Sequence, residues 1–328
     1  MHSGIEIRCY SMKEKEKTGW LVVVNPNAGV GKGEKDWKQI SNLLDKQGLK
    51  YRAKFTKRRL HAMHLVENQI IKGYRKIIVV GGDGTMNEAV NGIFNQQIIP
   101  TTEVTLSMIP VGTGNDWVRT FNIPTDYKKV VQIIKQGNTM LQDAGAVSYL
   151  NDHEVKNRFF INMAGLGFDG LVAQKTNYDK DHGRTNPFIY IKNLVSSLFS
   201  YKSSQIHVVV DDRIVDEKVF SLSIGIGQFN GGGMQQAPNA LPDDGLFDVT
   251  LIKDMSKWSV ITSLRKLYNG TIGQHKRVIT MVGKNIRIDS VPPVLLETDG
   301  ESLGSSPFEF QIIPKSIQVI FNNNKDVD

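Results

Sequence analysis

The chain has 328 residues, of which 40% are hydrophobic and 22% charged, and its formal net charge is +7. This length suits two domains that each bury a core, and the composition is that of a globular protein. The excess of positive charge suits an anionic ligand or an anionic membrane surface. The single cysteine, Cys9, excludes an internal disulfide framework and a cysteine-rich metal site, so we expect a reducing, cytoplasmic compartment.

The N-terminal segment does not have the pattern of a secretory signal, because charged residues interrupt it at Glu6, Arg8 and Lys13–Lys17. No window of about 18 apolar residues occurs in the chain, so we expect no segment to span a bilayer. We therefore expect any membrane contact to be peripheral, at the inner face of the membrane.

Residues 1–140 alternate between strand and helix patterns. The predicted strands are WLVVV from Trp20, YRAKFT from Tyr51, KIIVV from Lys76 and VTLSMIP from Val104, with helices at 37–48, 60–71 and 87–94. This alternation is typical of a doubly wound parallel α/β domain, which binds its ligands beyond the carboxyl ends of the strands. The segments NPNAG, GGDGT and PVGTGND follow three of those ends.

Residues 141–328 have a different pattern. Short runs rich in Phe, Ile and Val are separated by turn residues such as Asp211-Asp212, which predicts an antiparallel all-β domain with a sandwich architecture. Helices are predicted within it at Pro187–Tyr201 and Lys257–Tyr268. We expect the active site in the cleft between the two domains. The end of the chain could pack back on the first domain, and NNNKDVD is expected to be a frayed polar tail.

The loop GGDGT (Gly81–Thr85) combines three glycines with an aspartate. Its backbone can approach a ligand closely, and its amides, with the helix start expected near Asn87, would present donors to an anion. It has neither the Lys-Ser/Thr ending of a P-loop nor the G-x-G-x-x-G spacing. The alternative is a structural connection in which Asp83 and Thr85 cap the helix.

The segment PVGTGNDWVRTF (Pro110–Phe121) repeats this design, with Asn115 and Asp116 as N-cap residues before a helix. Two such loops at adjacent strand ends, with NPNAG as a third, predict a polar rim rich in amides. Such a rim suits phosphate groups.

These loops carry a resemblance to a known family. GGDGTMNEAVNG followed by PVGTGNDWVRTF resembles the catalytic signature of the diacylglycerol kinase family, in its soluble bacterial lipid kinase branch, which is similar to sphingosine and ceramide kinases. NPNAG, residues 228–252 (QFNGGGMQQAPNALPDDGLFDVTLI) and ETDGE (Glu297–Glu301) match further segments of the family. NAD kinases share GGDGT, but the five segments in this order are specific.

The resemblance implies an ATP site together with Mg²⁺. Asp83 would act on the phosphates through the magnesium and its waters. The implied ATP-site residues are Asn25, Pro26, Asn27, Ala28, Gly29, Thr56, Gly82, Asp83, Gly84, Thr85, Met86, Asn87, Glu88, Thr113, Asn115 and Asp116. Thr56 rests on the short match KFTK.

The resemblance also implies a structural Mg²⁺ held by Asp244 and by the backbone oxygens of Leu241 and Leu246. Asp243-Asp244-Gly245 is equally the signature of a hairpin turn. Because Mg²⁺ keeps several waters and needs few protein ligands, both interpretations can hold.

Phosphoryl transfer to a hydroxyl needs positioning, charge neutralisation and a proton acceptor. The turn ETDGES offers Glu297, Asp299 and Glu301 as acceptors, although such a turn can also be merely solvated. The resemblance implies Glu301 as the general base, with Asp299 as the competing candidate.

Two basic or amphipathic segments allow alternative interpretations. Pro187–Lys202 places five apolar residues on one helical face and could lie at a membrane interface or cover the β-domain. Lys54–His61 clusters four basic residues, which could meet anionic headgroups or form a solvated face.

Three functions are therefore weighed. The first is an ATP-dependent kinase of a membrane lipid, with diacylglycerol as the expected acceptor. The second is an NAD kinase, since AGLGFDG (Ala164–Gly170) resembles one of its loops, although PVGTGND and PNALPDDGLFD fit the lipid kinases. The third is a non-catalytic nucleotide-binding protein at the membrane. We expect no nucleic-acid partner, and a homodimer stays open.

Overall fold

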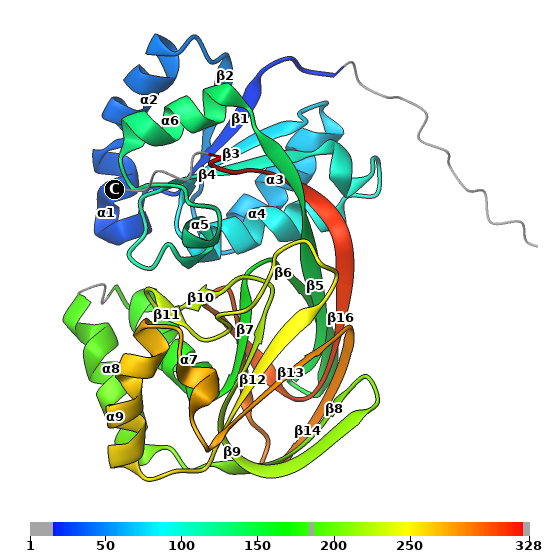
Figure 1. Cartoon of the computed structure of the whole chain (residues 1–328). Coiled ribbons are helices and arrows are strands. Elements are labelled where there is room, and N and C mark those ends of the chain that lie inside the picture. Colours follow the sequence, from blue (N-terminus) through cyan, green and yellow to red (C-terminus); the bar gives the residue numbers. More distant parts are fainter. Residues whose placement is uncertain (1–15, 184–186, 324–328) are drawn as a thin grey trace, which may run out of the picture.

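The structure is a computed structural model that describes residues 16–183 and 187–323 (Figure 1). The expectations for Cys9, for the N-terminal charged segment and for most of the polar C-terminal tail lie outside the described residues.

The first domain is built on four parallel strands in the order β2-β1-β3-β4. The central strand β1 is buried at every position, as is typical of parallel strands covered on both faces. Helices α1, α2 and α6 lie on one side of these strands and α3 and α4 on the other (Figure 1). The bounds are β1 Trp20–Val24, β2 Tyr51–Phe55, β3 Lys76–Gly81, β4 Thr105–Pro110, α1 Ala28–Lys35, α2 Trp37–Lys46, α3 His61–Ile71, α4 Asp83–Asn95, α5 Asp116–Thr120 and α6 Tyr127–Gln136.

Helix α4 begins earlier than predicted. Gly82 is its extended N-cap and Asp83 is already in its first turn, where a carboxylate is favoured by the helix dipole. No side chain caps this end, so the interpretation of Asp83 and Thr85 as caps of their own helix is wrong. The predicted strands of this domain, and the helices now seen as α2 and α3, are confirmed.

The second domain consists mainly of antiparallel strands. Asp211-Asp212 joins β8 to β9, as predicted. The helices predicted near residues 187 and 257 are confirmed as α8 and α9, whereas α7, β5 and β13 were not predicted. The bounds are β6 Glu154–Phe160, β7 Met163–Gly167, α7 Phe168–Asp181, α8 Pro187–Ser200, β8 Ser204–Val210, β9 Arg213–Gly225, β10 Phe229–Asn230, β11 Met234–Gln235, β12 Phe247–Lys253, α9 Lys257–Tyr268, β13 Val278–Gly283, β14 Asn285–Val291 and β15 Leu295–Thr298.

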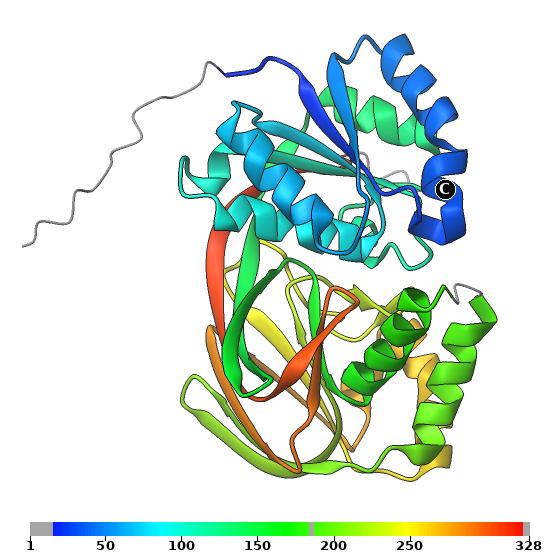
Figure 2. The same cartoon turned by 180° about the vertical axis from the view of Figure 1, so that it is seen from behind.

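Two long antiparallel strands, β5 (Thr139–Asn151) and β16 (Glu301–Ile320), run from one domain into the other (Figures 1 and 2). The runs FEFQII and SIQVIF are both part of β16, with a register shift between them. Near its end β16 pairs in parallel with β4, through Gln318 with Thr105 and Val319 with Leu106. One sheet therefore continues through both domains.

Each domain has its own apolar core. One core surrounds β1, β3 and β4, and the other lies among the strands of the second domain, around Phe160, Phe247 and Phe308. The predicted architecture, an α/β domain followed by an all-β domain, is confirmed. Among the described residues, no helix is long and apolar enough to cross a membrane.

A buried glutamine on β5 connects the two domains. Trp117 Nε1 donates to Gln142 Oε1 at 3.0 Å, and Gln142 Nε2 donates to the carbonyl oxygen of Ile161. Gln142 is completely buried. Its substitution by an apolar residue therefore leaves a buried donor and a buried acceptor without partners.

We expect Gln142→Leu to lower the free energy of unfolding by about 2 kcal/mol or more, because each unpaired buried polar group is costly. Urea denaturation measures the change. The matched control is Gln174→Leu on the exposed surface of α7, which we expect to change stability by about 0.5 kcal/mol at most. Equal stabilities of the two variants would contradict this role of Gln142.

Candidate active site

Asp83, at the start of α4, contacts the second glycine-rich loop. Its Oδ1 accepts the backbone N–H of Trp117 at 3.1 Å and so caps α5. A Cβ atom on Gly114 would lie 3.1 Å from Asp83 Oδ2 and 3.4 Å from Asp116 Oδ2. Both carboxylates therefore lie beside Gly114.

Both carboxyl groups are weaker acids than usual. Burial and the neighbouring Asp116 carboxylate raise the pKa of Asp83 to about 6. Burial also raises the pKa of Asp116. A cation placed between the two carboxylates would relieve this repulsion.

Asp116 also holds a hairpin of the second domain. Its two carboxylate oxygens accept the backbone N–H groups of Gly232 and Gly233 at 2.8 and 2.6 Å. These glycines belong to β10–β11 (229–235, the glycine hairpin), and both have positive φ angles, of 85° and 99°. Sequence reasoning matched this segment to the family but did not predict that it contacts Asp116.

The NPNAG loop packs against the other two loops. Asn25 Nδ2 donates to Thr85 Oγ1 at 2.9 Å, and Asn25 Oδ1 accepts the N–H of Asn27 at 3.1 Å. A Cβ atom on Gly29, whose φ is +61°, would lie 1.8 Å from the carbonyl oxygen of Val111. The three loops predicted to form a polar rim are thus in contact.

Five further residues of the predicted ATP site lie in or beside this rim. Pro26 and Ala28 belong to the NPNAG loop. Thr56 is buried, and its N–H donates to the carbonyl oxygen of Val24 at the end of β1. Thr113 is exposed on the PVGTGND loop, and the buried Asn115 holds that loop through a bond to the Gly112 carbonyl.

Three other residues of that predicted set have different partners. Met86 is buried in the core of the first domain. Glu88 accepts the N–H groups of Leu60 and Ala62 at 2.7 and 2.9 Å, and so caps α3. Asn87 is completely buried and accepts two bonds from Arg158.

The buried Asp299 is saturated with hydrogen bonds. Its oxygens accept Asn87 Nδ2 at 2.9 Å and three consecutive backbone N–H groups, at 3.0 to 3.1 Å, from Ile161, Asn162 and Met163. Burial raises its pKa. Asp299 therefore connects α4 to the β6–β7 link and the β15–β16 turn.

Glu301 lies against the first turn of α4. A Cβ atom on Gly84 would be 2.4 Å from Glu301 Oε1, and Glu301 Oε2 is 2.9 Å from Arg59 Nη2. Arg59 also donates to the carbonyl oxygen of Ser302 at 3.3 Å. The side chain of Glu301 is 18% exposed, so it is accessible beside Gly84. Arg59 was noticed only as part of a basic cluster, and nothing in the sequence pattern placed it beside Glu301.

Glu297, the third acid of this turn, is buried. It accepts Asn230 Nδ2 at 2.9 Å and the N–H of Gly300 at 2.8 Å. Burial raises its pKa to about 8. It therefore holds Asn230, next to the turn of the glycine hairpin that Asp116 holds.

The loop around Asp244 is not a hairpin turn. The strand that follows it, β12, pairs with β9 and β13, so the hairpin interpretation is wrong. Asp244 Oδ1 accepts the N–H of Leu246 at 3.0 Å, and Leu241 is exposed. Burial and Asp244 raise the pKa of Asp248 to about 6. Over residues 16–183 and 187–323, no group of three or more His, Cys, Asp or Glu side chains could hold a metal.

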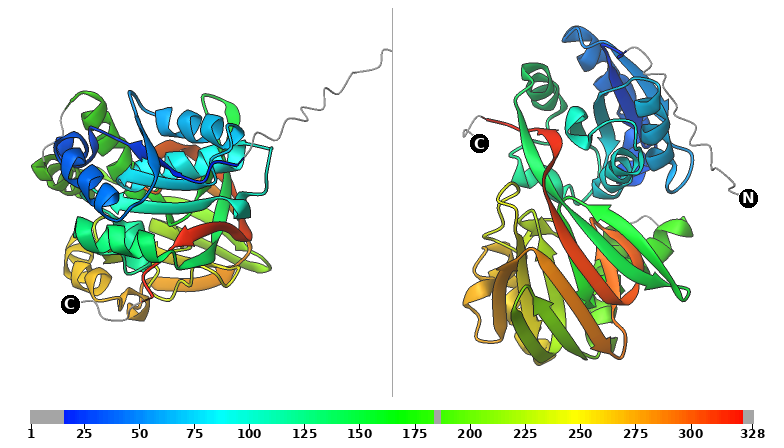
Figure 3. Two further views of the ribbon diagram at one scale, coloured as in Figure 1. Left: turned by 90° about the horizontal axis from the view of Figure 1, so that it is seen from above. Right: turned by 90° about the vertical axis from the view of Figure 1, so that its right-hand side faces the viewer.

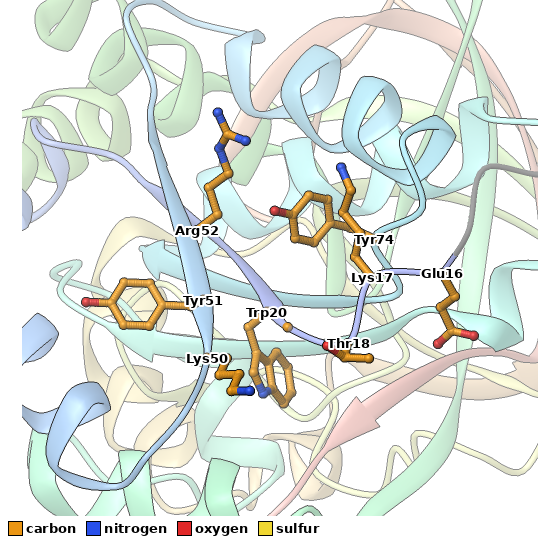
Figure 4. Close-up of a pocket in the computed structure, with 9 residues that line it drawn as sticks. Glu16, Lys17, Thr18, Trp20, Lys50, Tyr51, Arg52 and Tyr74 are labelled. Carbon is orange, nitrogen blue, oxygen red and sulfur yellow. The ribbon is translucent and has the colours of Figure 1, made fainter.

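A hollow of about 410 Å³ lies at the amino ends of the strands of the first domain, opposite the three loops (Figure 4). Residues at the beginnings of β1 and β2, with Glu16, Lys17 and Tyr74, line it. None of the predicted site residues does, and the amino ends of the strands are not where doubly wound sheets bind ligands.

Comparisons with known proteins agree with this arrangement. Residues 19–147 match the model of the diacylglycerol kinase catalytic domain, and residues 162–321 match that of the YegS C-terminal NAD kinase beta sandwich-like domain. A diacylglycerol kinase of Staphylococcus epidermidis is 28% identical over 91% of this chain and 90% of its own. One from Mycobacterium tuberculosis is 29% identical over 79% and 81%.

Solved structures show the same fold. A crystal structure of a diacylglycerol kinase from Bacillus anthracis str. Sterne has a TM-score of 0.68 at 22% identity and covers 93% of this chain and 97% of its own. Yeast NADH kinase complexed with NADH has a TM-score of 0.51 at 12% identity, covering 93% and 84%. With both domain models matched in order, the chain belongs to the diacylglycerol kinase family, whose members are phosphotransferases with an alcohol group as acceptor.

Proposed function

We propose that this protein is an ATP-dependent lipid kinase that transfers the γ-phosphoryl group to a hydroxyl of a membrane lipid, with diacylglycerol as acceptor. The observation that carries the proposal is the position of Glu301. Its carboxylate, from the second domain, lies against Gly84 in the glycine-rich turn of the first domain, one residue from Asp83. A proton acceptor and a phosphate-binding turn are thus adjacent.

The three-loop rim supplies the nucleotide site in this proposal. Main-chain amides at the start of α4 and polar groups of Asn25, Thr56, Thr85 and Thr113 would contact ATP. Met86, Asn87 and Glu88 would act by fixing α4, since their side chains contact the core, Asp299 and α3.

Asp83 and Asp116 would hold the Mg²⁺ that accompanies ATP. Carboxylate oxygens are the ligands that Mg²⁺ prefers, and an oxygen of each of these two carboxylates lies beside Gly114. When bound, the metal neutralises charge on the phosphates. A second, structural Mg²⁺ would be held by the Asp244 carboxylate and the backbone oxygens of Leu241 and Leu246. Carboxylate and carbonyl oxygens are suitable ligands for Mg²⁺, and waters would complete the set.

Glu301 is the better general base of the two candidates. Asp299 accepts four N–H groups, so its lone pairs are already used. Glu301 has the Arg59 ion pair and a free side facing Gly84. It would take the proton of the lipid hydroxyl as the phosphoryl group arrives, while Arg59 orients it.

The first test offers labelled ATP with either diacylglycerol in detergent micelles or NAD. We expect labelled phospholipid and no labelled NADP, because the chain carries both domains of the diacylglycerol kinase family. Thin-layer chromatography and mass spectrometry identify the products. Labelled product from NAD alone would overturn the proposal, and no product from either, or from a total lipid extract, would favour a non-catalytic nucleotide-binding protein.

The second test separates the two carboxylates. We expect Glu301→Gln to lower kcat by about 100-fold or more with an unchanged melting temperature, because it removes only the proton acceptor. Asp299→Asn should instead lower the free energy of unfolding by about 1 to 3 kcal/mol, because an amide group would face a backbone donor. Near-normal turnover in Glu301→Gln would mean that the base lies elsewhere.

The third test concerns the contact between Gly84 and Glu301. Gly84→Ala places a methyl group 2.4 Å from Glu301 Oε1, too close for both to stay, so we expect kcat to fall by about 10- to 100-fold through displacement of the base. Gly273→Ala is the control, since its new methyl group would meet only Thr280 Cγ2 at 3.4 Å. If both variants keep full activity, Glu301 does not act from this position.

A further inference from the structure

Three strongly exposed apolar residues lie one or two positions in sequence from residues that line one hollow of the second domain. Among the described residues, Trp258 and Val291 are the most exposed large hydrophobic side chains, at 77% each, and Phe199 is 68% exposed. They come from the first turn of α9, the end of β14 and the last turn of α8. Exposed apolar side chains are stabilised when another surface covers them and removes water. Several such residues in one region therefore indicate a binding surface.

The hollow lies between the end of α8 and the beginning of α9. It has a volume of about 650 Å³ and is lined by residues 201–203, 254–257, Lys218 and Pro292. Lys257 Nζ donates to the Tyr201 carbonyl oxygen at 2.7 Å, which holds the two helix ends together. The three exposed residues are thus sequence neighbours of residues that line it.

The exposed apolar residues continue along both helices. On α8, Ile191, Val195 and Phe199 are exposed at intervals of four residues. On α9, Trp258, Ile261 and Tyr268 are exposed at positions that share one helical face. The opposite faces, including Leu194, Leu198 and Val260, pack against the apolar cluster beneath.

Both helices lie on the same side of the second domain, away from β14 and β16 (Figures 1 and 3). Helix α8 runs along this side from the end nearest the first domain to the end where β8 begins (Figure 2). The exposed apolar residues of α8 therefore extend from the region of the domain boundary to the hollow.

The charged residues of α8 and α9 are all basic. Neither α8 nor α9 contains an acidic residue. Lys192 and Arg265 are exposed on the helices, and Lys202 and Lys218 flank the hollow. Nearby acids include Asp254, whose Oδ2 lies 3.9 Å from Lys218 Nζ, and Asp179 of α7, whose Oδ2 accepts the side-chain N–H of Asn193 on α8.

We propose that the exposed face of α8 and α9, together with the rim of the hollow, is a docking surface for an anionic phospholipid bilayer. Tryptophan and tyrosine are favoured at the membrane interface, and lysine and arginine beside an apolar stripe suit anionic headgroups. This proposal rests on the proposed function, because a kinase of membrane lipids must meet its acceptor at a bilayer. The proposal adds that the contact with the bilayer is made through this surface.

The test uses the full chain and vesicles of phosphatidylglycerol and phosphatidylcholine. We expect the protein to co-sediment with mixed vesicles and much less with pure phosphatidylcholine. Phe199→Glu combined with Trp258→Glu should weaken this binding by about tenfold or more, because apolar side chains are replaced by charges that anionic headgroups repel. Val155→Glu is the matched control, since Val155 is also 68% exposed but lies on β6; it should bind normally.

Tryptophan fluorescence gives a second measurement that does not depend on catalysis. Trp20 and Trp117 are buried and Trp37 is half-buried, so Trp258 is the tryptophan that a bilayer can reach. Brominated lipids should quench the emission of the wild type and not of Trp258→Phe, which keeps its affinity for vesicles. Absence of quenching in the bound wild type would overturn the proposal.

Activity measurements separate this inference from the proposed function. With lipid in detergent micelles, the double variant should match the wild type, whereas with lipid in vesicles it should lose activity in proportion to binding. If the wild type binds vesicles but phosphorylates no lipid, the proposed function is refuted and the docking surface is still supported. Unchanged vesicle binding in the double variant would overturn the docking surface, and a wild-type dimer that this variant disrupts would then assign the surface to a second copy.

Discussion

The arrangement of the candidate site depends on one buried carboxylate. Asp299 receives three backbone N–H groups from the β6–β7 link and one side-chain N–H from Asn87 on α4. A buried charge is tolerated only when such donors surround it, so the two domains must keep this relation for Asp299 to be stable. Glu301 follows two residues later, and its distance from Asp83 is therefore set by this bond network.

A second link closes the other side of the site. Asp116 of the first domain holds the turn of the glycine hairpin, and Glu297 of the second domain holds Asn230 next to that turn. The same turn carries Glu297, Asp299 and Glu301, but only the last is accessible. Three acids in five residues thus have separate roles because burial and donors differ: two position the backbone and one is available for chemistry.

Much of the fold and part of the site could be predicted from the sequence. The strands of the first domain are apolar runs, and the loops after them carry glycines that their close contacts require, as at Gly29 and Gly84. The length of β16 could not be predicted, because Pro314 and the positive φ angle of Lys315 interrupt its pattern while pairing with β5 continues on both sides. The caps could not be predicted either: Asp83 caps α5 and Glu88 caps α3, and both bonds join segments distant in sequence.

The sequence by itself determined the order of the two domains, the three glycine-rich loops and the set of acids available for catalysis. These follow from local properties: strand and helix periodicity, and the small size of glycine. Only the tertiary structure decided which acid is accessible, which acids are buried among hydrogen-bond donors, and that Arg59 pairs with Glu301. It also decided which apolar residues of α8 face the core and which face solvent. Such outcomes depend on contacts between distant segments, and the burial and donors that those contacts create do not exist before the chain has folded.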